Sequence, residues 1–304
     1  MLIEKSYKIN EINGYIEQCM DLYIFGNGNS ERDKFFRESY SRRYPEKTAI
    51  FSYNVETEAF THNDDTKEYS LRADFTNFLK GIIRSTGDRI FIDITSMPIP
   101  FMFYLFSTLS EIKPRQVLCG YSKPIEYLRN SIENERDIFE LSEKFVGIKP
   151  IPGFLRSDKQ NRDKILVLFL GYEGKRAKYV NEEEGSKSIV PVIGLPGFHP
   201  GWHDTAFEMN LELIRESLSV DEVEYVAADS PFEAFELLHA ILRKHENKYL
   251  VISPLSTKAI SLGVALFTLR FNENTSIIYD NPIEKLDKSK GYYSSIVYDI
   301  SEFI

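Results

Sequence analysis

Small, hydroxylic and basic residues gather in four short turns, each of which follows an apolar run and precedes a helix-like stretch. Glycine in such a turn lets a ligand approach the backbone, and the free N–H groups at the start of the following helix attract an anion. A phosphate or carboxylate is therefore the ligand chemistry that these turns favour. The candidate ligand-binding residues in them are Gly26, Asn27, Gly28, Arg32, Thr95, Ser96, Gly171, Lys175, Arg176, Ser256, Thr257 and Lys258.

The turn at 171–176 carries the strongest signal because two cations, Lys175 and Arg176, stand at a predicted helix start. The helix dipole favours negative side chains there, so these cations make sense as partners for a ligand's phosphate or carboxylate. Alternatively, Glu173 neutralises them in a surface cluster. The turn lacks the Walker A pattern.

The counterpart turn at 26–32 has two early glycines but lacks the third glycine of a G-x-G-x-x-G fingerprint. Its alternative interpretation is an ordinary Gly/Asn turn in which Ser30 is the N-cap of the next helix. The hydroxyls of the two remaining turns, at 93–98 and 253–258, would also suit helix capping alone.

Glu173 and Asp93 lie at equivalent predicted strand ends. In an enzyme they would serve as a general base and an electrostatic partner, for example in hydrolysis of a nucleotide or its glycosidic bond. A turn or capping role is the alternative for Asp93. The catalytic assignment applies only if the protein is an enzyme.

The loop at 197–204 contains Trp202, the only tryptophan of the chain, which would stack on a nucleobase if the loop lines a binding site. A metal site would use His199, His203 and Asp204, but two histidines across a Pro-Gly turn are a poor ligand template. We therefore expect an ordered loop with Asp204 as an acid in the first turn of a helix, no metal and no cofactor.

Periodicity and flanking breakers predict the elements that position these turns. Apolar strands alternate with amphipathic helices, which predicts mainly parallel α/β sheets covered on both faces, with ligands bound beyond the carboxyl ends of the strands. The expected strands are 21–25, 48–53, 89–94, 116–120, 164–170, 188–193, 223–227, 249–252 and 276–279. The expected helices are 30–43, 71–84, 98–111, 175–183, 202–217, 231–244 and 257–269.

An internal repeat underlies this pattern. A Tyr-x-x-Pro-Ile-Glu sequence begins at Tyr121 and again at Tyr279, and the segments 21–32 and 165–176 align without a gap. We therefore expect two tandem Rossmann-like halves related by duplication: 1–150, a linker at 151–163, and 164–304. If a pseudo-dyad relates the halves, their turns would face one shared cleft.

The segment 253–263, Ser-Pro-Leu-Ser-Thr-Lys-Ala-Ile-Ser-Leu-Gly, resembles the strand–Thr-Lys–helix motif of CARF domains, although Pro254-Leu255 replaces the usual double glycine. Two such units in one chain resemble the SAVED arrangement. The resemblance implies a sensor of cyclic oligonucleotides in bacterial antiviral defence, with ligand contacts at Ser256, Thr257 and Lys258 and, through the repeat, at Thr95 and Ser96. It also implies signalling to a separate effector protein.

Composition narrows the class further. The net charge of −9, from 37 basic and 46 acidic residues, disfavours an extended nucleic-acid surface. The two cysteines exclude a disulfide scaffold. We expect no membrane partner and a cytoplasmic location, because no long apolar run or signal-peptide pattern is present. A third hypothesis is a protein-binding component of a defence complex, with Tyr292, Tyr293 and Tyr298 at an interface or in a last strand.

Overall fold

The chain forms two compact units, one made of residues 1–128 and 285–304 and the other of residues 129–284. We call them unit 1 and unit 2. The computed structural model describes residues 5–63, 65–127, 141–149, 151, 153–154, 158, 160–186, 188–216, 223–285 and 289–304. The expected linker at 151–163 lies partly outside these residues. The expected second half ran to residue 304, whereas residues 285–304 belong with unit 1 by their contacts.

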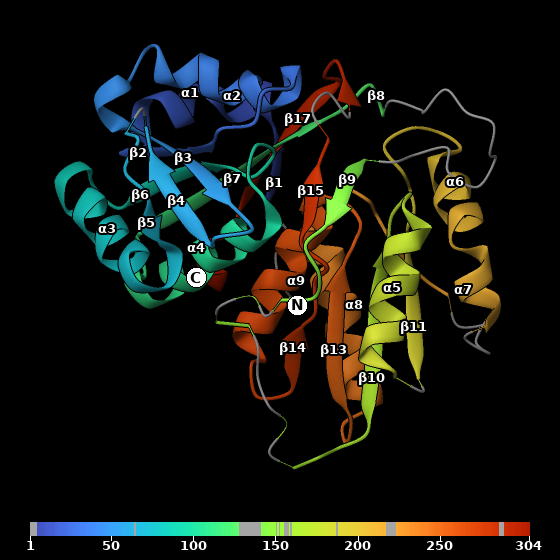
Figure 1. The fold of residues 1–304 in the computed structure, drawn as a ribbon. Coiled ribbons are helices and arrows are strands. Elements are labelled where there is room, and N and C mark those ends of the chain that lie inside the picture. Colours follow the sequence, from blue (N-terminus) through green and yellow to red (C-terminus); the bar gives the residue numbers. More distant parts are fainter. Residues whose placement is uncertain are drawn as a thin grey trace. The chain divides into compact units, whose positions relative to one another are not determined.

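Unit 1 is built on a mixed sheet (Figure 1) whose described strands are ordered β1-β17-β7-β6-β2-β3-β4-β5. The central strands β7, β6, β2 and β3 run parallel, and the outer strands pair antiparallel. A short ribbon of β8 and β16 accompanies the sheet. The strands are β1 (Ser6–Lys8), β2 (Leu22–Gly26), β3 (Thr48–Asn54), β4 (Ala59–His62), β5 (Tyr69–Ser70), β6 (Arg89–Asp93), β7 (Gln116–Lys123), β8 (Glu126–Tyr127), β16 (Ser289–Lys290) and β17 (Ser294–Asp299).

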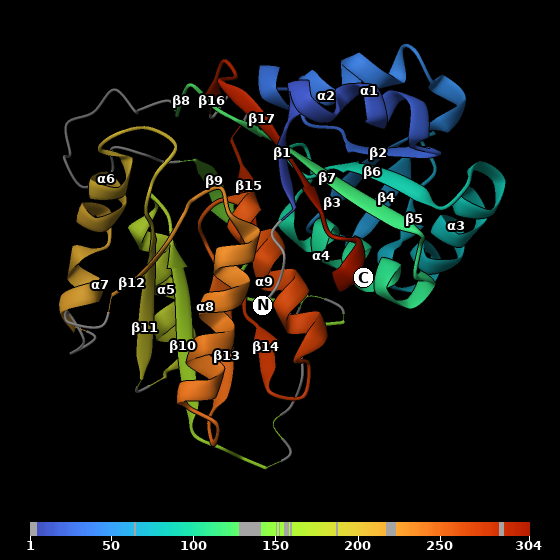
Figure 2. The same ribbon diagram turned by 180° about the vertical axis from the view of Figure 1, so that it is seen from behind.

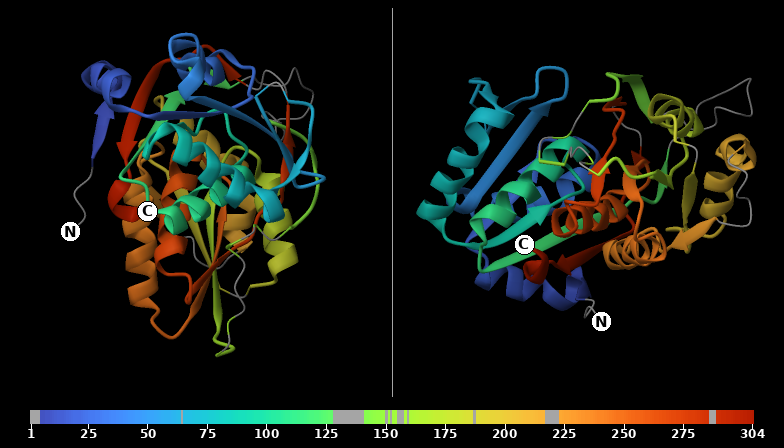
Figure 3. Two further views of the ribbon diagram at one scale, coloured as in Figure 1. Left: turned by 90° about the vertical axis from the view of Figure 1, so that its left-hand side faces the viewer. Right: turned by 90° about the horizontal axis from the view of Figure 1, so that it is seen from below.

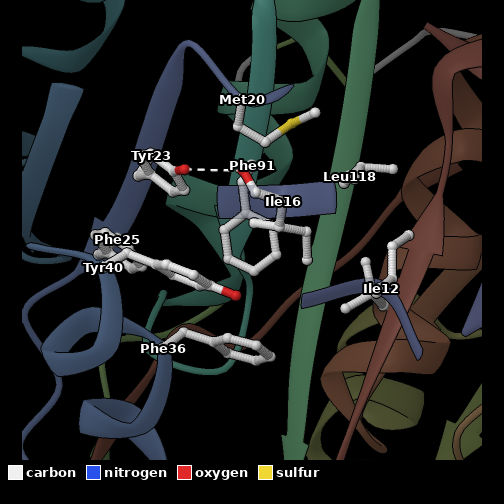
Figure 4. Close-up of a cluster of buried hydrophobic side chains, with 10 residues drawn as sticks. Ile12, Ile16, Met20, Tyr23, Phe25, Phe36, Tyr40, Phe91 and Leu118 are labelled. Carbon is white, nitrogen blue, oxygen red and sulfur yellow. Dashed lines mark hydrogen bonds between the residues drawn. The ribbon is translucent and has the colours of Figure 1, made fainter. Parts of the chain in front are cut away.

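Helices cover both faces of this sheet, α1 and α2 on one side and α3 and α4 on the other (Figures 1 and 3). Under α1 and α2 lies a core of alternate strand residues, which includes Tyr23 and Phe91 (Figure 4). The Tyr23 hydroxyl is buried, and it donates a hydrogen bond to the Ile16 carbonyl oxygen over 2.9 Å. The helices are α1 (Ile9–Cys19), α2 (Glu31–Ser41), α3 (Leu71–Thr86) and α4 (Ile99–Ile112), with short 3-10 turns η1 (Pro45–Lys47) and η3 (Ser301–Phe303).

Unit 2 contains a parallel sheet whose described strands are ordered β12-β11-β10-β13-β14. Helices α5, α6 and α7 lie on one face and α8 and α9 on the other (Figures 1 and 2). An antiparallel ribbon joins β9 and β15. The strands are β9 (Ser142–Phe145), β10 (Lys164–Leu170), β11 (Ile189–Gly194), β12 (Glu224–Val226), β13 (Tyr249–Pro254), β14 (Thr275–Ile277) and β15 (Pro282–Glu284). The helices are α5 (Gly174–Glu184), α6 (Trp202–Met209), α7 (Leu211–Glu216), α8 (Pro231–Lys244) and α9 (Lys258–Arg270).

Local sequence explains where these helices begin. The Ser230 side chain caps α8 by accepting from the Glu233 N–H over 3.1 Å, and Pro231 suits the first helical position. Ser30 caps α2 in the same way, as the alternative interpretation of its turn predicted. The α/β class is confirmed. The expectation of mainly parallel sheets holds for the described sheet of unit 2, whereas in unit 1 antiparallel strands flank a parallel centre. The predicted helix 202–217 is wrong in one respect, because Asn210 interrupts it between α6 and α7; residue 217 lies outside the described residues.

Within the described part of the chain, no helix combines the length and the apolar composition that crossing a membrane requires.

Candidate functional site

The order of the parallel strands reverses beside β10 in unit 2 and beside β2 in unit 1. In unit 2, β11 and β12 extend the sheet to one side of β10, and β13 and β14 extend it to the other. Ligands of doubly wound sheets bind outside the carboxyl ends of the strands at such a reversal. The turns that follow β10 and β13 therefore define the candidate site of unit 2.

These two turns touch each other at Gly171 and Leu255. A Cβ atom on Gly171 would lie 2.5 Å from the Leu255 carbonyl oxygen, so only glycine lets the backbones approach this closely. The Leu255 N–H in turn donates to the Phe169 carbonyl oxygen over 3.0 Å. The approach brings the starts of α5 and α9 to one place on the sheet edge.

Thr257 holds the second turn in position. Its hydroxyl accepts from the Ile260 N–H over 3.2 Å as the N-cap of α9, and it donates to the Ala228 carbonyl oxygen over 2.5 Å. The capping function considered from the sequence is thus present, and the same hydroxyl ties α9 to the turn after β12. Ser256 and Lys258 flank it and are half-buried, with Lys258 as the first residue of α9.

Asn210, between α6 and α7, secures the first turn. Its Nδ2 donates to the carbonyl oxygens of Gly171 and Ala206, each over 2.7 Å. A Cβ on Gly174 would clash with the Met209 carbonyl oxygen, so this second glycine also permits a close backbone approach. Lys175, the next residue, is exposed on the first turn of α5.

Arg176 has a different environment from its neighbour. It is 8% exposed, and its Nε and Nη2 donate to Asp280 over 2.7 and 2.8 Å. Its Nη1 lies 3.3 Å from Glu173, and its guanidinium carbon lies 5.5 Å from the centre of the Tyr279 ring. Burial alone would lower the pKa of Arg176, but Tyr279, the hydrogen bonds to Asp280 and the charge of Asp280 together raise that pKa well above its usual value. Arg176 is therefore a permanently charged part of a buried network.

Glu173 belongs to the same network. Its carboxylate accepts from the backbone N–H groups of Leu141 and Ser142, each over 2.9 Å, and from the Ser142 hydroxyl over 3.1 Å. These bonds attach the segment before β9 to the start of α5. The network takes the place of the surface charge cluster considered from the sequence.

The predicted residues of unit 1 meet in a corresponding way. The Gly26 N–H donates to the Ser96 hydroxyl over 2.8 Å, and a Cβ on Gly26 would clash with the Ser96 carbonyl oxygen. The Thr95 hydroxyl accepts from the Ser122 N–H over 2.9 Å, and buried Asp93 accepts from the Thr95 N–H over the same distance. These hydroxyls and this carboxylate hold the turn after β6 against its neighbours.

Three further predicted residues of unit 1 surround the start of α2. Asn27 is exposed and Gly28 half-buried in the turn. Arg32 is 4% exposed, and its guanidinium carbon lies 5.6 Å from the centre of the Tyr127 ring.

The candidate residues divide between the two units, and within each unit the turns that carry them touch at a glycine, Gly171 against Leu255 and Gly26 against Ser96. In unit 2 they are Gly171, Lys175, Arg176, Trp202, Ser256, Thr257 and Lys258; in unit 1 they are Gly26, Asn27, Gly28, Arg32, Thr95 and Ser96. Sequence reasoning missed Asn210 and Asp280 as partners. Asp280 stands inside the repeated Tyr-x-x-Pro-Ile-Glu motif, which was the available signal.

Trp202 lies in a cluster of aromatic rings at this edge. The ring centres of Tyr172, Phe198 and His199 lie 6.0, 6.2 and 4.7 Å from that of Trp202. His203 directs Nε2 toward Asp204 at 3.3 Å, and Asp204 stands in the first turn of α6 as expected. Across the described residues, no group of three or more His, Cys, Asp or Glu side chains is arranged to hold a metal ion.

Comparison with models of known protein families finds no match for this chain, and comparison with curated proteins finds none.

Proposed function

We propose that this protein senses a nucleotide-like anionic ligand, for which the CARF and SAVED resemblance suggests a cyclic oligonucleotide. The ligand's phosphates would bind at the carboxyl edges of the parallel sheets, and binding would signal to a separate effector in antiviral defence. The observation that carries the proposal is the contact of Gly171 with Leu255, because it joins two helix starts at the reversal of strand order in unit 2.

Electrostatics supports an anion at this place. Lys175 lies in the first turn of α5 and Lys258 begins α9, so two cations accompany two helix N-termini near one contact. Helix N-termini stabilise negative groups, so a phosphate at either helix start would meet free backbone N–H groups together with a lysine side chain. Arg176 contributes indirectly, since its ion pair with Asp280 anchors the start of α5.

The proposal includes two Rossmann-like units that arose by duplication. In each unit a glycine after the first parallel strand packs against the backbone of the turn across the reversal, Gly26 on Ser96 and Gly171 on Leu255. In each, a buried arginine of the next helix lies over a tyrosine ring, Arg32 over Tyr127 and Arg176 over Tyr279. The Pro-Ile-Glu segment of each unit also takes part in a short antiparallel ribbon, through Glu126 of β8 in unit 1 and as strand β15 in unit 2.

The test is a thermal-shift and calorimetric panel of linear mononucleotides and cyclic oligoadenylates, preceded by mass spectrometry of small molecules that copurify. We expect at least one nucleotide to stabilise the protein, and the variant Lys175→Glu/Lys258→Glu to lose at least tenfold in affinity for it.

Lys244→Glu is the control, because Lys244 is exposed in the last turn of α8, about 20 Å along that helix from its start at the carboxyl edge of the sheet. It should retain the affinity within about twofold, since exposed charges contribute little at a distance. If no nucleotide binds, or if the double variant binds as the control does, the proposed anion site is refuted.

A further inference from the structure

Four aromatic rings form a cluster at the carboxyl edge of the sheet in unit 2. Trp202 is at its centre, and Tyr172, Phe198 and His199 meet its ring at interplanar angles of 83°, 58° and 63°. All four side chains are half-buried. Steep ring contacts of this kind are favourable for aromatic pairs, and they fix the orientation of the central indole.

The cluster lies at the same edge as the two turns that carry the proposed anion site. Tyr172 lies in the turn after β10, between Gly171 and the start of α5, and the other three rings lie between β11 and the first turn of α6. Tyr172 thus belongs both to the ring cluster and to the turn that contacts Leu255. A ligand held at the start of α5 would have the rings beside it.

The chemistry at this edge matches one kind of ligand. Exposed Lys175, three residues after Tyr172, suits a phosphate, and the rings suit a flat heterocycle. A nucleotide combines these two groups in one molecule, at a separation spanned by its sugar. Because the rings already hold one another, binding a base would require little additional ordering of side chains.

Unit 1 differs at the corresponding position. In the gapless match of segments 21–32 and 165–176, Gly28 stands where unit 2 has Tyr172, and Asn27 and Asn29 flank it. The turn after β2 therefore offers amides and backbone where the turn after β10 offers a ring. The repeat preserves the glycine approach and the buried arginine in both units, whereas the aromatic residue of the turn occurs in unit 2.

We infer that unit 2 binds a nucleobase of the ligand by stacking in the cluster of Tyr172, Phe198, His199 and Trp202, with one base per chain. This inference rests on the proposed function and specifies which part of the ligand unit 2 recognises. The aligned turn of unit 1, with Asn27, Gly28 and Asn29, offers no ring for such stacking.

Three probes distinguish binding of the base from binding of the phosphate. Adenosine carries the base alone, ribose 5-phosphate carries the phosphate alone, and adenosine 5′-monophosphate carries both. Since Trp202 is the only tryptophan in the chain, its fluorescence reports on this cluster specifically. We expect adenosine and the monophosphate to quench that fluorescence, with a calorimetric stoichiometry of one, and ribose 5-phosphate to bind without quenching.

The variant Tyr172→Leu should weaken binding of adenosine 5′-monophosphate by roughly fivefold or more, the effect of losing one base–ring contact. Its affinity for ribose 5-phosphate should be unchanged. Tyr225→Leu is the matched control, because Tyr225 in β12 of the same unit is 49% exposed. Trp202→Leu should act as Tyr172→Leu does in calorimetry, whereas Trp202→Phe should retain most of the affinity.

Equal affinity for the monophosphate and ribose 5-phosphate, without quenching by adenosine, would overturn the base-stacking site and leave the anion site standing. A stoichiometry of two would overturn the assignment to unit 2 alone. Failure of all three probes to bind at millimolar concentration would overturn the base-stacking site, whereas the anion site would be refuted only if the cyclic oligoadenylates of the first panel also failed to bind. If the ring variants do not fold, binding of the three probes to the unaltered protein still tests whether a base stacks in the cluster.

Discussion

Arg176 and Asp280 form a two-pronged ion pair in the interior of unit 2, with Nε and Nη2 donating to the two carboxylate oxygens over 2.7 and 2.8 Å. Asp280 is fully buried and the Arg176 side chain is 10% exposed. The pair connects the start of α5 with the segment after β14, which are far apart in the sequence. Arg176, which the sequence predicted as a ligand-binding cation, therefore has a structural role.

Removal of one partner of this pair should strongly destabilise unit 2. Asp280→Asn removes the closer of the two carboxylates around buried Arg176 and leaves only Glu173 at 3.3 Å, and breaking a buried ion pair costs about 3–5 kcal/mol. Urea unfolding of the single variant measures this. The matched control is Lys164→Met, which removes an ion pair with Glu184 in which the lysine is 52% exposed. It should cost at most about 1 kcal/mol, and equal losses in the two variants would contradict the structural role of the pair.

The ion pair between Asp21 and Arg89 should make the stability of unit 1 depend on pH. Arg89 donates to Asp21 over 2.9 and 2.8 Å, and this hydrogen bonding lowers the pKa of Asp21, against the opposing effect of its burial. A carboxyl with a lowered folded pKa stabilises the protein above its unfolded pKa of about 3.9, and the stabilisation disappears as pH falls through the folded value.

Asp21→Asn should therefore lower the unfolding free energy at pH 7, and the difference from the unaltered protein should shrink steadily below pH 4. Unfolding curves for both proteins between pH 2.5 and 7 provide the measurement. A difference that stays constant over this range would show that the effect is one of packing and not of charge.

Gly26 and Gly81 should respond in opposite directions to the same substitution. Gly26→Ala places a methyl group against the Ser96 carbonyl and should cost about 1–3 kcal/mol, because the two turns must separate. Gly81 is inside α3, where an added Cβ has no atom within 4 Å, so Gly81→Ala should stabilise by about 0.5–1 kcal/mol. Thermal denaturation of both variants tests the pair, and a stable Gly26→Ala variant would argue against the close approach of the turns.

Two substitutions of Thr257 test the contribution of its hydroxyl to the stability of unit 2. Thr257→Ser keeps the hydroxyl that accepts from Ile260 and donates to Ala228, so its stability should match that of the unaltered protein within about 0.5 kcal/mol. Thr257→Val loses both bonds and should cost about 1–2 kcal/mol. Chemical unfolding of the two variants measures the contrast, which should vanish if the hydroxyl has no structural part.

The strands and helices of the parallel core were predictable because their signals are local. Strand β10 and helix α8 begin and end at the residues expected from apolar runs, a serine N-cap and basic residues at the helix end. Helix α1 and most antiparallel strands were not predicted, although a last strand at Tyr298 was one of two alternatives and β17 contains this buried residue. Such strands are short, and their pairing depends on partners far along the chain; β17, for example, pairs with both β1 and β7.

Glycine, hydroxyl and cation patterns predicted the candidate turns. They did not predict which residue of each turn is exposed and which is part of a buried network. Lys175 and Arg176 are adjacent and both cationic, yet Lys175 is exposed whereas Arg176 is buried beside Asp280. Helix geometry points neighbouring side chains about 100° apart, so one faces solvent and the next faces the interior. Without the location of Asp280, the sequence had no means to choose between them.

The pairing of β17 with β7 has a consequence for synthesis of the chain. Strands β2, β3, β6 and β7 leave the ribosome early, but Ser294–Asp299 must emerge before β7 gains its neighbour and β1 can join the sheet through β17. Unit 2 lies wholly between these segments, so all of its strands are synthesised while the sheet of unit 1 is still incomplete. In the nascent chain, the sheet of unit 1 therefore has an unpaired edge at β7 until β17 is synthesised. A chaperone that covers this edge would protect the chain from aggregation mainly during that interval.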